Sequence, residues 1–126
     1  MDSSPRNFSL LIMCAFIFTI FGFGESLEME VRIFNILGVG VELTLQCRSA
    51  GVNLGQHNIS TQEQYYFTVV PGTPVYSCSF VWPGNAHSFD IYVEKRDYEN
   101  CKEYCFWEIK PNGPCFTSTK QCYPWR

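Results

Sequence analysis

The stretch Val41-Glu-Leu-Thr-Leu-Gln-Cys47 alternates apolar and polar side chains, and Tyr76-Ser-Cys-Ser-Phe-Val-Trp82 places a large or inward-type side chain at every second position. Side chains two residues apart lie on the same face of a β-strand. Each stretch therefore predicts a strand with one face directed into a hydrophobic core. Cys47 and Cys78 both fall on that inward face, from different strands.

Further short strands are expected on both sides of these two. Residues 31–37 end at Gly38-Val-Gly40, which predicts an antiparallel pair with residues 41–48, joined by a glycine turn. Residues 49–55 are expected to form a loop. The remaining strands are expected at residues 64–70, 75–82, 88–95 and 105–110, with Phe89, Ile91, Val93, Cys105, Trp107 and Ile109 directed inward.

This pattern predicts the fold class. Short strands separated by turns about every eight to twelve residues are typical of a β-sandwich. We therefore expect an all-β fold, namely a disulfide-stabilised antiparallel β-sandwich of two sheets. No apolar stripe with a helical period follows residue 27, so little room is expected for a helix. The acidic residues Asp90, Glu94 and Asp97 are interpreted as surface and turn residues.

The N-terminal segment has the organisation of a secretory signal peptide. Residues 8–23 form an uncharged, mostly apolar run that follows Arg6 and precedes Gly24-Glu-Ser26. We expect cleavage after Gly24 or Ser26, which gives a signal peptide at residues 1–24 and an exported domain at residues 25–126. A retained anchor is the alternative, although the run is short for a membrane span. The mature chain is expected to be secreted, with no membrane span.

Cysteine usage indicates a disulfide framework. The chain has 7 cysteines, of which Cys14 lies in the predicted signal peptide. An even number in a short secreted chain is typical of disulfides. A zinc site is the competing interpretation, but the second closely spaced pair of ligands is missing. We therefore expect no metal and no cofactor, and about fifteen complete pairings remain open. The six remaining cysteines are Cys47, Cys78, Cys101, Cys105, Cys115 and Cys122.

Composition and charge exclude some functional classes. A content of 46% hydrophobic and 17% aromatic residues indicates a packed domain and argues against disorder. A formal net charge of −3 argues against nucleic-acid binding, which depends on clustered cations. Asn58-Ile-Ser60 is a sequon for N-glycosylation.

No motif in the chain predicts catalysis. His57 and His87 are the only histidines, and a nuclease that uses two histidines as base and acid is the enzymatic alternative. No nucleophile elbow, metalloprotease motif or phosphate-binding loop accompanies them. We interpret both histidines as surface or loop-anchoring residues and expect the protein not to be an enzyme.

Several blocks together resemble the plant self-incompatibility S-protein homologue family. The resemblance implies a secreted β-sandwich held by disulfides and a role as a small extracellular ligand, because the founding members are pistil proteins recognised by incompatible pollen. The cysteine-rich run from Cys101 to Cys122 resembles a crucifer subgroup rather than the poppy-type members. The blocks are Val31-Arg-Ile-Phe-Asn-Ile-Leu37, Leu43-Thr-Leu-Gln-Cys-Arg-Ser49, Asn53-Leu-Gly-Gln-His57, Tyr76-Ser-Cys-Ser-Phe-Val-Trp82, Phe89-Asp-Ile-Tyr-Val93 and Cys105-Phe-Trp-Glu-Ile-Lys-Pro-Asn-Gly-Pro-Cys115.

The function expected from the resemblance is recognition of a cell-surface receptor or another extracellular protein. The candidate recognition loop consists of Asn53, Leu54, Gly55, Gln56 and His57, because loops carry binding while stapled sheets hold them. The alternative is that Asn53 and Gly55 only shape a turn. A secreted defence protein, antimicrobial or inhibitory to an enzyme, is the alternative function, and a secreted nuclease is the least favoured.

Overall fold

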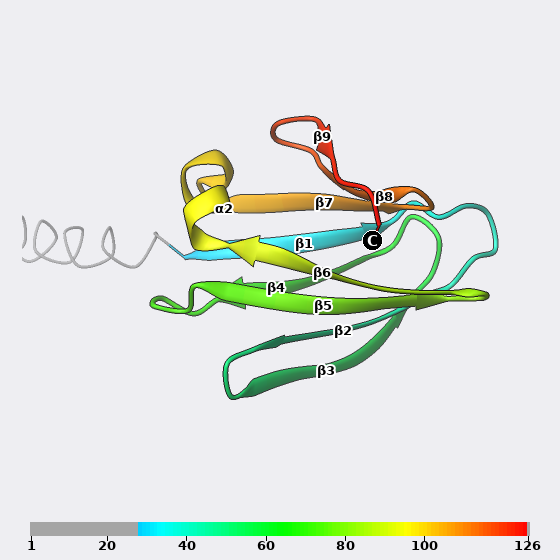
Figure 1. Cartoon of the computed structure of the whole chain (residues 1–126), viewed down its shortest axis with the longest axis horizontal. Helices are drawn as coiled ribbons and strands as arrows, with labels where there is room; N and C mark the ends of the chain where they lie inside the picture. Colours follow the sequence, from blue (N-terminus) through cyan, green and yellow to red (C-terminus); the bar gives the residue numbers. More distant parts are fainter. Residues whose placement is uncertain (1–27, 126) are drawn as a thin grey trace, which may run out of the picture.

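Nine β-strands and one short helix account for most of residues 28–125, the part of the chain that this computed structural model describes (Figure 1). The predicted signal peptide and its cleavage sites lie outside the described residues. In chain order the elements are β1 (Met29–Asn35), β2 (Leu43–Ser49), β3 (Val52–Ile59), β4 (Gln64–Val69), β5 (Val75–Trp82), β6 (Asn85–Val93), α2 (Glu94–Cys101), β7 (Tyr104–Lys110), β8 (Gly113–Phe116) and β9 (Gln121–Cys122).

The strands form two sheets, which confirms the predicted β-sandwich. The five-stranded sheet has the order β4-β1-β7-β8-β9, and the four-stranded sheet has the order β3-β2-β5-β6. All pairs are antiparallel except β1 and β7, which are parallel. Figure 1 shows α2 at the end of the sandwich where β1 begins, and the C-terminus near the end of β1.

The predicted hairpin between residues 31–37 and 41–48 is wrong. β1 pairs with β4 along one edge and with β7 along the other, so neither of its edges is available to β2. β2 lies instead in the opposite sheet, between β3 and β5. The connection between β1 and β2 therefore crosses from one sheet to the other.

The core consists of the inward faces that alternation predicts. Leu43, Leu45 and Cys47 of β2 are fully buried, and Trp107 of β7 is the largest fully buried side chain. In β6 the prediction is only partly right. A register shift between Tyr76 and Ser77 inserts one residue into β6, so Ile91 and Tyr92 are both buried and Val93 is half-buried.

The predicted absence of a helix is also wrong, because Glu94–Cys101 forms α2. Only Asp97 and Cys101 of this helix are buried, so it lacks the apolar stripe by which sequence analysis recognises a helix. The prediction that Asp97 lies at the surface fails with it, since Asp97 has no exposed area. α2 connects β6 of one sheet to β7 of the other.

Three disulfides join the six cysteines. Cys47–Cys78 links paired positions of β2 and β5, and Cys115–Cys122 links paired positions of β8 and β9. Cys101–Cys105 joins the end of α2 to the start of β7. The Sδ atom of Met29 lies 3.7 Å from the Sγ atom of Cys105, a van der Waals contact because a disulfide sulfur carries no hydrogen.

Candidate functional site

The outer face of the four-stranded sheet is mostly polar, with Val81 and Ala86 as its exposed apolar residues. Residues that alternate with the buried positions line up in cross-strand rows, such as Arg48, Ser77 and Asp90 in one row and Gln46, Ser79 and Ser88 in the next. Short hydroxyl and amide side chains dominate these rows. The residues of this surface, called here the polar face, are Thr44, Gln46, Arg48, Asn53, Gln56, Asn58, Ser77, Ser79, Ser88 and Asp90.

A groove of about 680 Å³ begins on the polar face and crosses edge strand β6. Its lining includes Arg48 and Ser77 from the face, Asp90 from β6, Arg96 from α2 and Tyr123 from the C-terminal tail. The groove therefore joins three strands of the four-stranded sheet, the helix and the C-terminal tail. It is a concave surface with hydrogen-bonding groups, the kind of site that orients a ligand.

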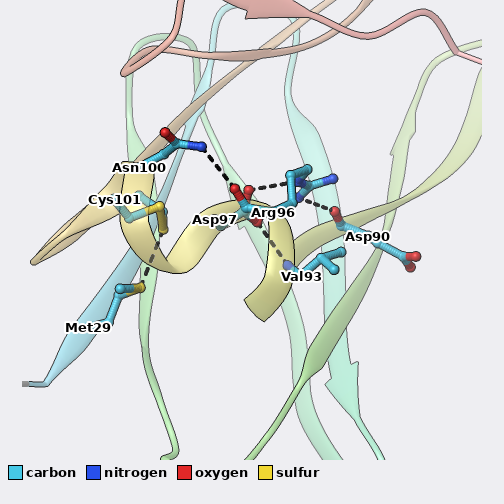
Figure 2. Close-up of a disulfide and its surroundings, with 8 residues drawn as sticks. Met29, Asp90, Val93, Arg96, Asp97, Asn100 and Cys101 are labelled. Carbon is cyan, nitrogen blue, oxygen red and sulfur yellow. Dashed lines mark hydrogen bonds and ion pairs between the residues drawn. A yellow bond between two sulfur atoms is a disulfide. The ribbon is translucent and has the colours of Figure 1, made fainter.

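An ion pair at the wall of the groove fixes its shape. Arg96 donates from Nε to Asp97 Oδ1 at 2.6 Å and from Nη2 to Asp97 Oδ2 at 2.7 Å. Arg96 Nη2 also donates to the backbone oxygen of Asp90 at 2.8 Å, and the amide of Val93 donates to Asp97 Oδ2 at 2.8 Å. Figure 2 shows these contacts around the first turn of α2. They attach the helix to edge strand β6.

Aromatic rings complete the environment of the Arg96 side chain. Its guanidinium carbon lies 5.3 Å from the ring centroid of Phe89, 5.1 Å from that of Trp107 and 5.7 Å from that of Tyr123. These distances are within the range of cation–π attraction. Arg96 is consequently held in place by the protein, and its main role is structural.

Asp90 and Arg48 of the groove differ in whether a neighbouring side chain already binds them. Ser77 Oγ donates to Asp90 Oδ1 at 2.5 Å, so this carboxylate is already oriented. Arg48 is exposed, and it takes part in none of the ion pairs found among residues 28–125. Arg48 is therefore the cation of the groove that is available to a ligand.

The segment predicted as a recognition loop is part of strand β3, so the prediction of a loop is wrong. β3 is an edge strand of its sheet, and its pairing with β2 shifts between Gln46 and Arg48. This bulge contains Gly55, whose φ of +88° is a conformation that suits glycine. An edge strand with a bulge resists pairing with another chain.

The five residues of this segment point to different places. Asn53 and Gln56 belong to the polar face, and Asn53 Oδ1 accepts from Gly55 N at 2.8 Å and from Gln46 Nε2 at 3.1 Å. Leu54 packs against the core. The His57 ring lies 3.2 Å from the backbone oxygen of Leu54. The structure thus brings only two of the five residues to the polar face.

The two histidines are anchored by aromatic rings. His57 stacks on Tyr65 with ring centroids 4.2 Å apart, and His87 stacks on Trp125 at 4.6 Å. In the four-stranded sheet they occupy one cross-strand row on opposite edge strands, with Leu45 and Phe80 between them. Three strand spacings separate them, roughly 14 Å. They are too far apart to serve as base and acid at one bond.

Among the described residues, neither a cluster of metal ligands nor a membrane-spanning helix is present. Within residues 28–125 no group of three or more His, Cys, Asp or Glu side chains is arranged to hold a metal ion. All six cysteines in this range are in disulfides, so no thiolate is available as a ligand. No helix in the same range has the length and apolar character needed to cross a bilayer.

Two features of the groove were missed by sequence reasoning. One is the Arg96–Asp97 pair, in which Asp97 is fully buried and Arg96 half-buried, and the other is the aromatic tail, whose Tyr123 lines the groove and whose Trp125 stacks on His87. Adjacent opposite charges are common on surfaces, so the sequence does not distinguish a buried pair. The two aromatic residues close to the C-terminus were a usable signal, because large aromatic side chains are seldom left in solvent.

Comparison with known proteins is consistent across sequence and structure. The family model described as plant self-incompatibility protein S1 matches residues 30–125. S-protein homolog 5 of Arabidopsis thaliana is 37% identical, over 91% of this chain and 96% of that protein, and S-protein homolog 18 is 38% identical, over 95% of each.

A solved structure has the same fold. It belongs to the SPH proteins (self-incompatibility protein homologues), described as a widespread family of small, highly stable, secreted proteins from plants. The TM-score is 0.61 at 18% identity, over 81% of this chain and 97% of that one. This chain belongs to the plant self-incompatibility protein S1 family of small secreted plant proteins.

Proposed function

We propose that the protein is an extracellular recognition ligand that acts on a cell-surface partner through the groove of the polar face. The observation that carries the proposal is the groove itself, a preformed concave surface of about 680 Å³ in a member of a secreted family. Preorganised polar surfaces lose little conformational entropy when they bind, which favours specific recognition.

The chemistry of the groove favours a polar, extended segment of the partner. Ser77, Ser79 and Ser88 are short, so a backbone can approach the sheet and exchange hydrogen bonds with hydroxyl groups. Arg48 supplies a planar cation that suits a carboxylate. The partner segment therefore carries hydrogen-bonding groups along its length and an acidic group opposite Arg48.

The test is saturable binding of the secreted protein, labelled with a fluorophore, to plant protoplasts. Arg48→Glu reverses the available charge, and we expect it to weaken binding at least about tenfold. Lys120→Glu is the matched control, since it makes the same charge change at an exposed turn residue that does not line the groove. Equal binding by both variants, or the absence of saturable binding by the wild type, would refute the proposal.

Processing of the N-terminus and glycosylation belong to the same proposal. Cleavage after Gly24 or Ser26 releases the domain, and Asn58 is exposed on the polar face. Asn58 pairs with Thr44, four residues along β2 from Arg48, which is about 13 Å. A glycan on Asn58 thus leaves the Arg48 end of the groove open. Intact mass of the secreted protein, before and after enzymatic deglycosylation, tests both points.

We also expect no enzymatic activity. The distance between His57 and His87 argues against the two-histidine nuclease mechanism, since base and acid must reach the same bond. Incubation of the purified protein with RNA is expected to leave it intact. Cleavage that persists when both histidines are replaced would point to a contaminant, whereas cleavage that is lost with them would overturn this part.

A further inference from the structure

The outer face of the five-stranded sheet differs from the polar face in that it carries exposed aromatic rings. Tyr66 of β4 and Tyr104 of β7 are 58% and 41% exposed. Phe34 of β1 and Phe106 of β7 lie on the same face and are half-buried. These four rings, together with Arg32 at their centre, are called here the aromatic strip.

The aromatic strip extends across three strands, β4, β1 and β7. Arg32 is paired in register with Tyr66 on one side and with Phe106 on the other. The ring centroids of Phe34 and Phe106 are 6.2 Å apart and those of Tyr104 and Phe106 are 5.7 Å apart, with interplanar angles of 32° and 31°. Phe34, Phe106 and Tyr104 therefore form a row of neighbouring rings with similar orientations, and Arg32 lies between this row and the Tyr66 ring.

The charge of Arg32 is satisfied within the protein. Its Nη2 atom lies 2.8 Å from Glu30 Oε1, and Nη1 donates to Gln64 Oε1 at 3.3 Å. Its guanidinium carbon lies 5.1 Å from the Tyr66 ring centroid and 5.3 Å from that of Tyr104. The third nitrogen, Nε, is buried and has no hydrogen-bond partner among the described residues, so it is not accessible to a ligand. The aromatic strip thus presents no free charge, which favours an uncharged ligand over an acidic one.

The size of the aromatic strip favours a small repeating unit over a protein surface. Two strand spacings and two two-residue steps along a strand give roughly 10 Å by 13 Å, on the order of 130 Å². A stable protein interface buries about 800 Å² on each partner. Sugar rings have the matching dimensions, and their C–H faces pack on aromatic rings while their hydroxyl groups bond to polar neighbours.

Polar side chains of the required kind flank the rings. Gln64 and Thr68 are exposed on edge strand β4, and Glu30 pairs in register with Thr68. We propose that the aromatic strip binds an uncharged polysaccharide, with sugar rings stacked on Tyr66 and Tyr104 and hydroxyl groups bonded to the side chains of β4. This site is on the opposite sheet from the groove and is independent of the receptor proposal.

The experiment measures binding of the full secreted chain to cellohexaose, xylohexaose and mannohexaose, with polygalacturonate as the anionic comparison. We expect at least one neutral hexasaccharide to bind. The double variant Tyr66→Ala/Tyr104→Ala should weaken that binding by about tenfold or more. Tyr66→Trp should retain it, because the larger ring keeps the stacking surface. Tyr98→Ala, which removes a tyrosine that is 61% exposed on α2, is the matched control and should bind as the wild type.

Three results would overturn the proposal. The first is failure of the wild type to bind any neutral hexasaccharide, including the case in which only polygalacturonate binds. The second is equal binding by the double variant and the Tyr98→Ala control. The third is a wild-type dimer in sedimentation that the double variant dissociates, which would assign the aromatic strip to a second copy of the chain. Near-UV circular dichroism of each variant checks that the fold is retained.

Discussion

Asn35 shows how one buried polar residue holds the two sheets in register. It is fully buried at the end of β1, and its Nδ2 donates to the backbone oxygens of Val41 at 2.8 Å and Ile59 at 2.9 Å. Its Oδ1 accepts from the amide of Leu37 at 3.0 Å. The side chain therefore binds backbone groups of the β1–β2 connection and the end of β3, where the chain changes sheets.

Replacement of Asn35 should destabilise the fold. Asn35→Ala removes a hydrogen-bond partner from the carbonyl of Ile59 and the amide of Leu37 and one of two donors from the carbonyl of Val41. We expect the free energy of unfolding to fall by about 2 to 4 kcal/mol. Guanidinium unfolding followed by tryptophan fluorescence measures the change. Asn53→Ala serves as the control, because its hydrogen bonds are exposed, and should cost less than about 1 kcal/mol. Similar losses in the two variants would contradict this role of Asn35.

Tyr92 links stability to alkaline pH. Burial raises the pKa of Tyr92, with a further contribution from the nearby carboxylates of Glu94 and Asp97. In the unfolded chain a tyrosine loses its proton near about pH 10. Above that pH the unfolded state binds fewer protons than the folded state. Ionisation of Tyr92 therefore leaves the free energy of unfolding unchanged below a pH of about 10 and lowers it as the pH rises further.

The corresponding test replaces the hydroxyl group. Tyr92→Phe cannot ionise, so the decrease in the free energy of unfolding above about pH 10 should be shallower than in the wild type. Rapid urea unfolding at a series of alkaline pH values measures this slope. The pKa of Tyr65 is also raised by burial, so part of the slope should remain. A variant slope equal to that of the wild type would contradict the assignment.

The C-terminal tail covers one end of the core and is attached to it by hydrogen bonds. The amide of Tyr123 donates to Pro114 O at 2.9 Å, and that of Trp125 donates to Asn112 O at 3.3 Å. The Trp125 indole donates to Lys110 O at 3.3 Å, and its ring stacks on His87. The tail thus covers the opening between edge strand β6 and the β7–β8 hairpin.

Gly113 makes this close approach possible. A Cβ atom there would overlap the backbone oxygen of Tyr123, so Gly113→Ala should displace the tail and cost about 2 to 4 kcal/mol. A red shift of tryptophan emission would report exposure of Trp125. Gly72→Ala is the matched control, since Gly72 also has a positive φ but no atom within 4 Å of the added Cβ, and it should cost about 1 kcal/mol. If the tail keeps its position in Gly113→Ala, this role of Gly113 would be contradicted.

For the whole molecule, the disulfides stabilise each layer separately. Cys47–Cys78 lies within the four-stranded sheet and Cys115–Cys122 within the five-stranded sheet, while Cys101–Cys105 joins α2 to its following strand. None of the three connects strands of the two sheets. The facing hydrophobic surfaces, with Asn35 and the crossing connections, hold the sandwich together.

The bridges should differ in their contribution to stability. The sequence separation is 31 residues for Cys47–Cys78 and 4 for Cys101–Cys105. In the loop-entropy treatment these closures contribute about 3.7 and about 1.9 kcal/mol. Paired alanine replacements, compared by thermal unfolding, should therefore give the larger loss for Cys47/Cys78. An equal or reversed order would show that packing around the bridge, rather than loop length, determines its effect.

The sequence by itself determined the buried face of most strands, the all-β class and the family. Alternation is a property of a single strand, so Leu45, Cys47 and Trp107 could be placed in the core without knowledge of their partners. The inward direction of Cys47 and Cys78 followed in the same way, although their pairing did not. The family blocks were recognisable because they coincide with these strands.

Only the tertiary structure decided which strands are neighbours and where the candidate site lies. The separation of β1 from β2, the assignment of β3 as a bulged edge strand and the burial of Asp97 in α2 all depend on contacts between distant segments. The groove and the aromatic strip arise for the same reason, since each gathers side chains from several strands. A local pattern specifies which side of a strand is buried, whereas the pairing of edges depends on how the whole chain packs.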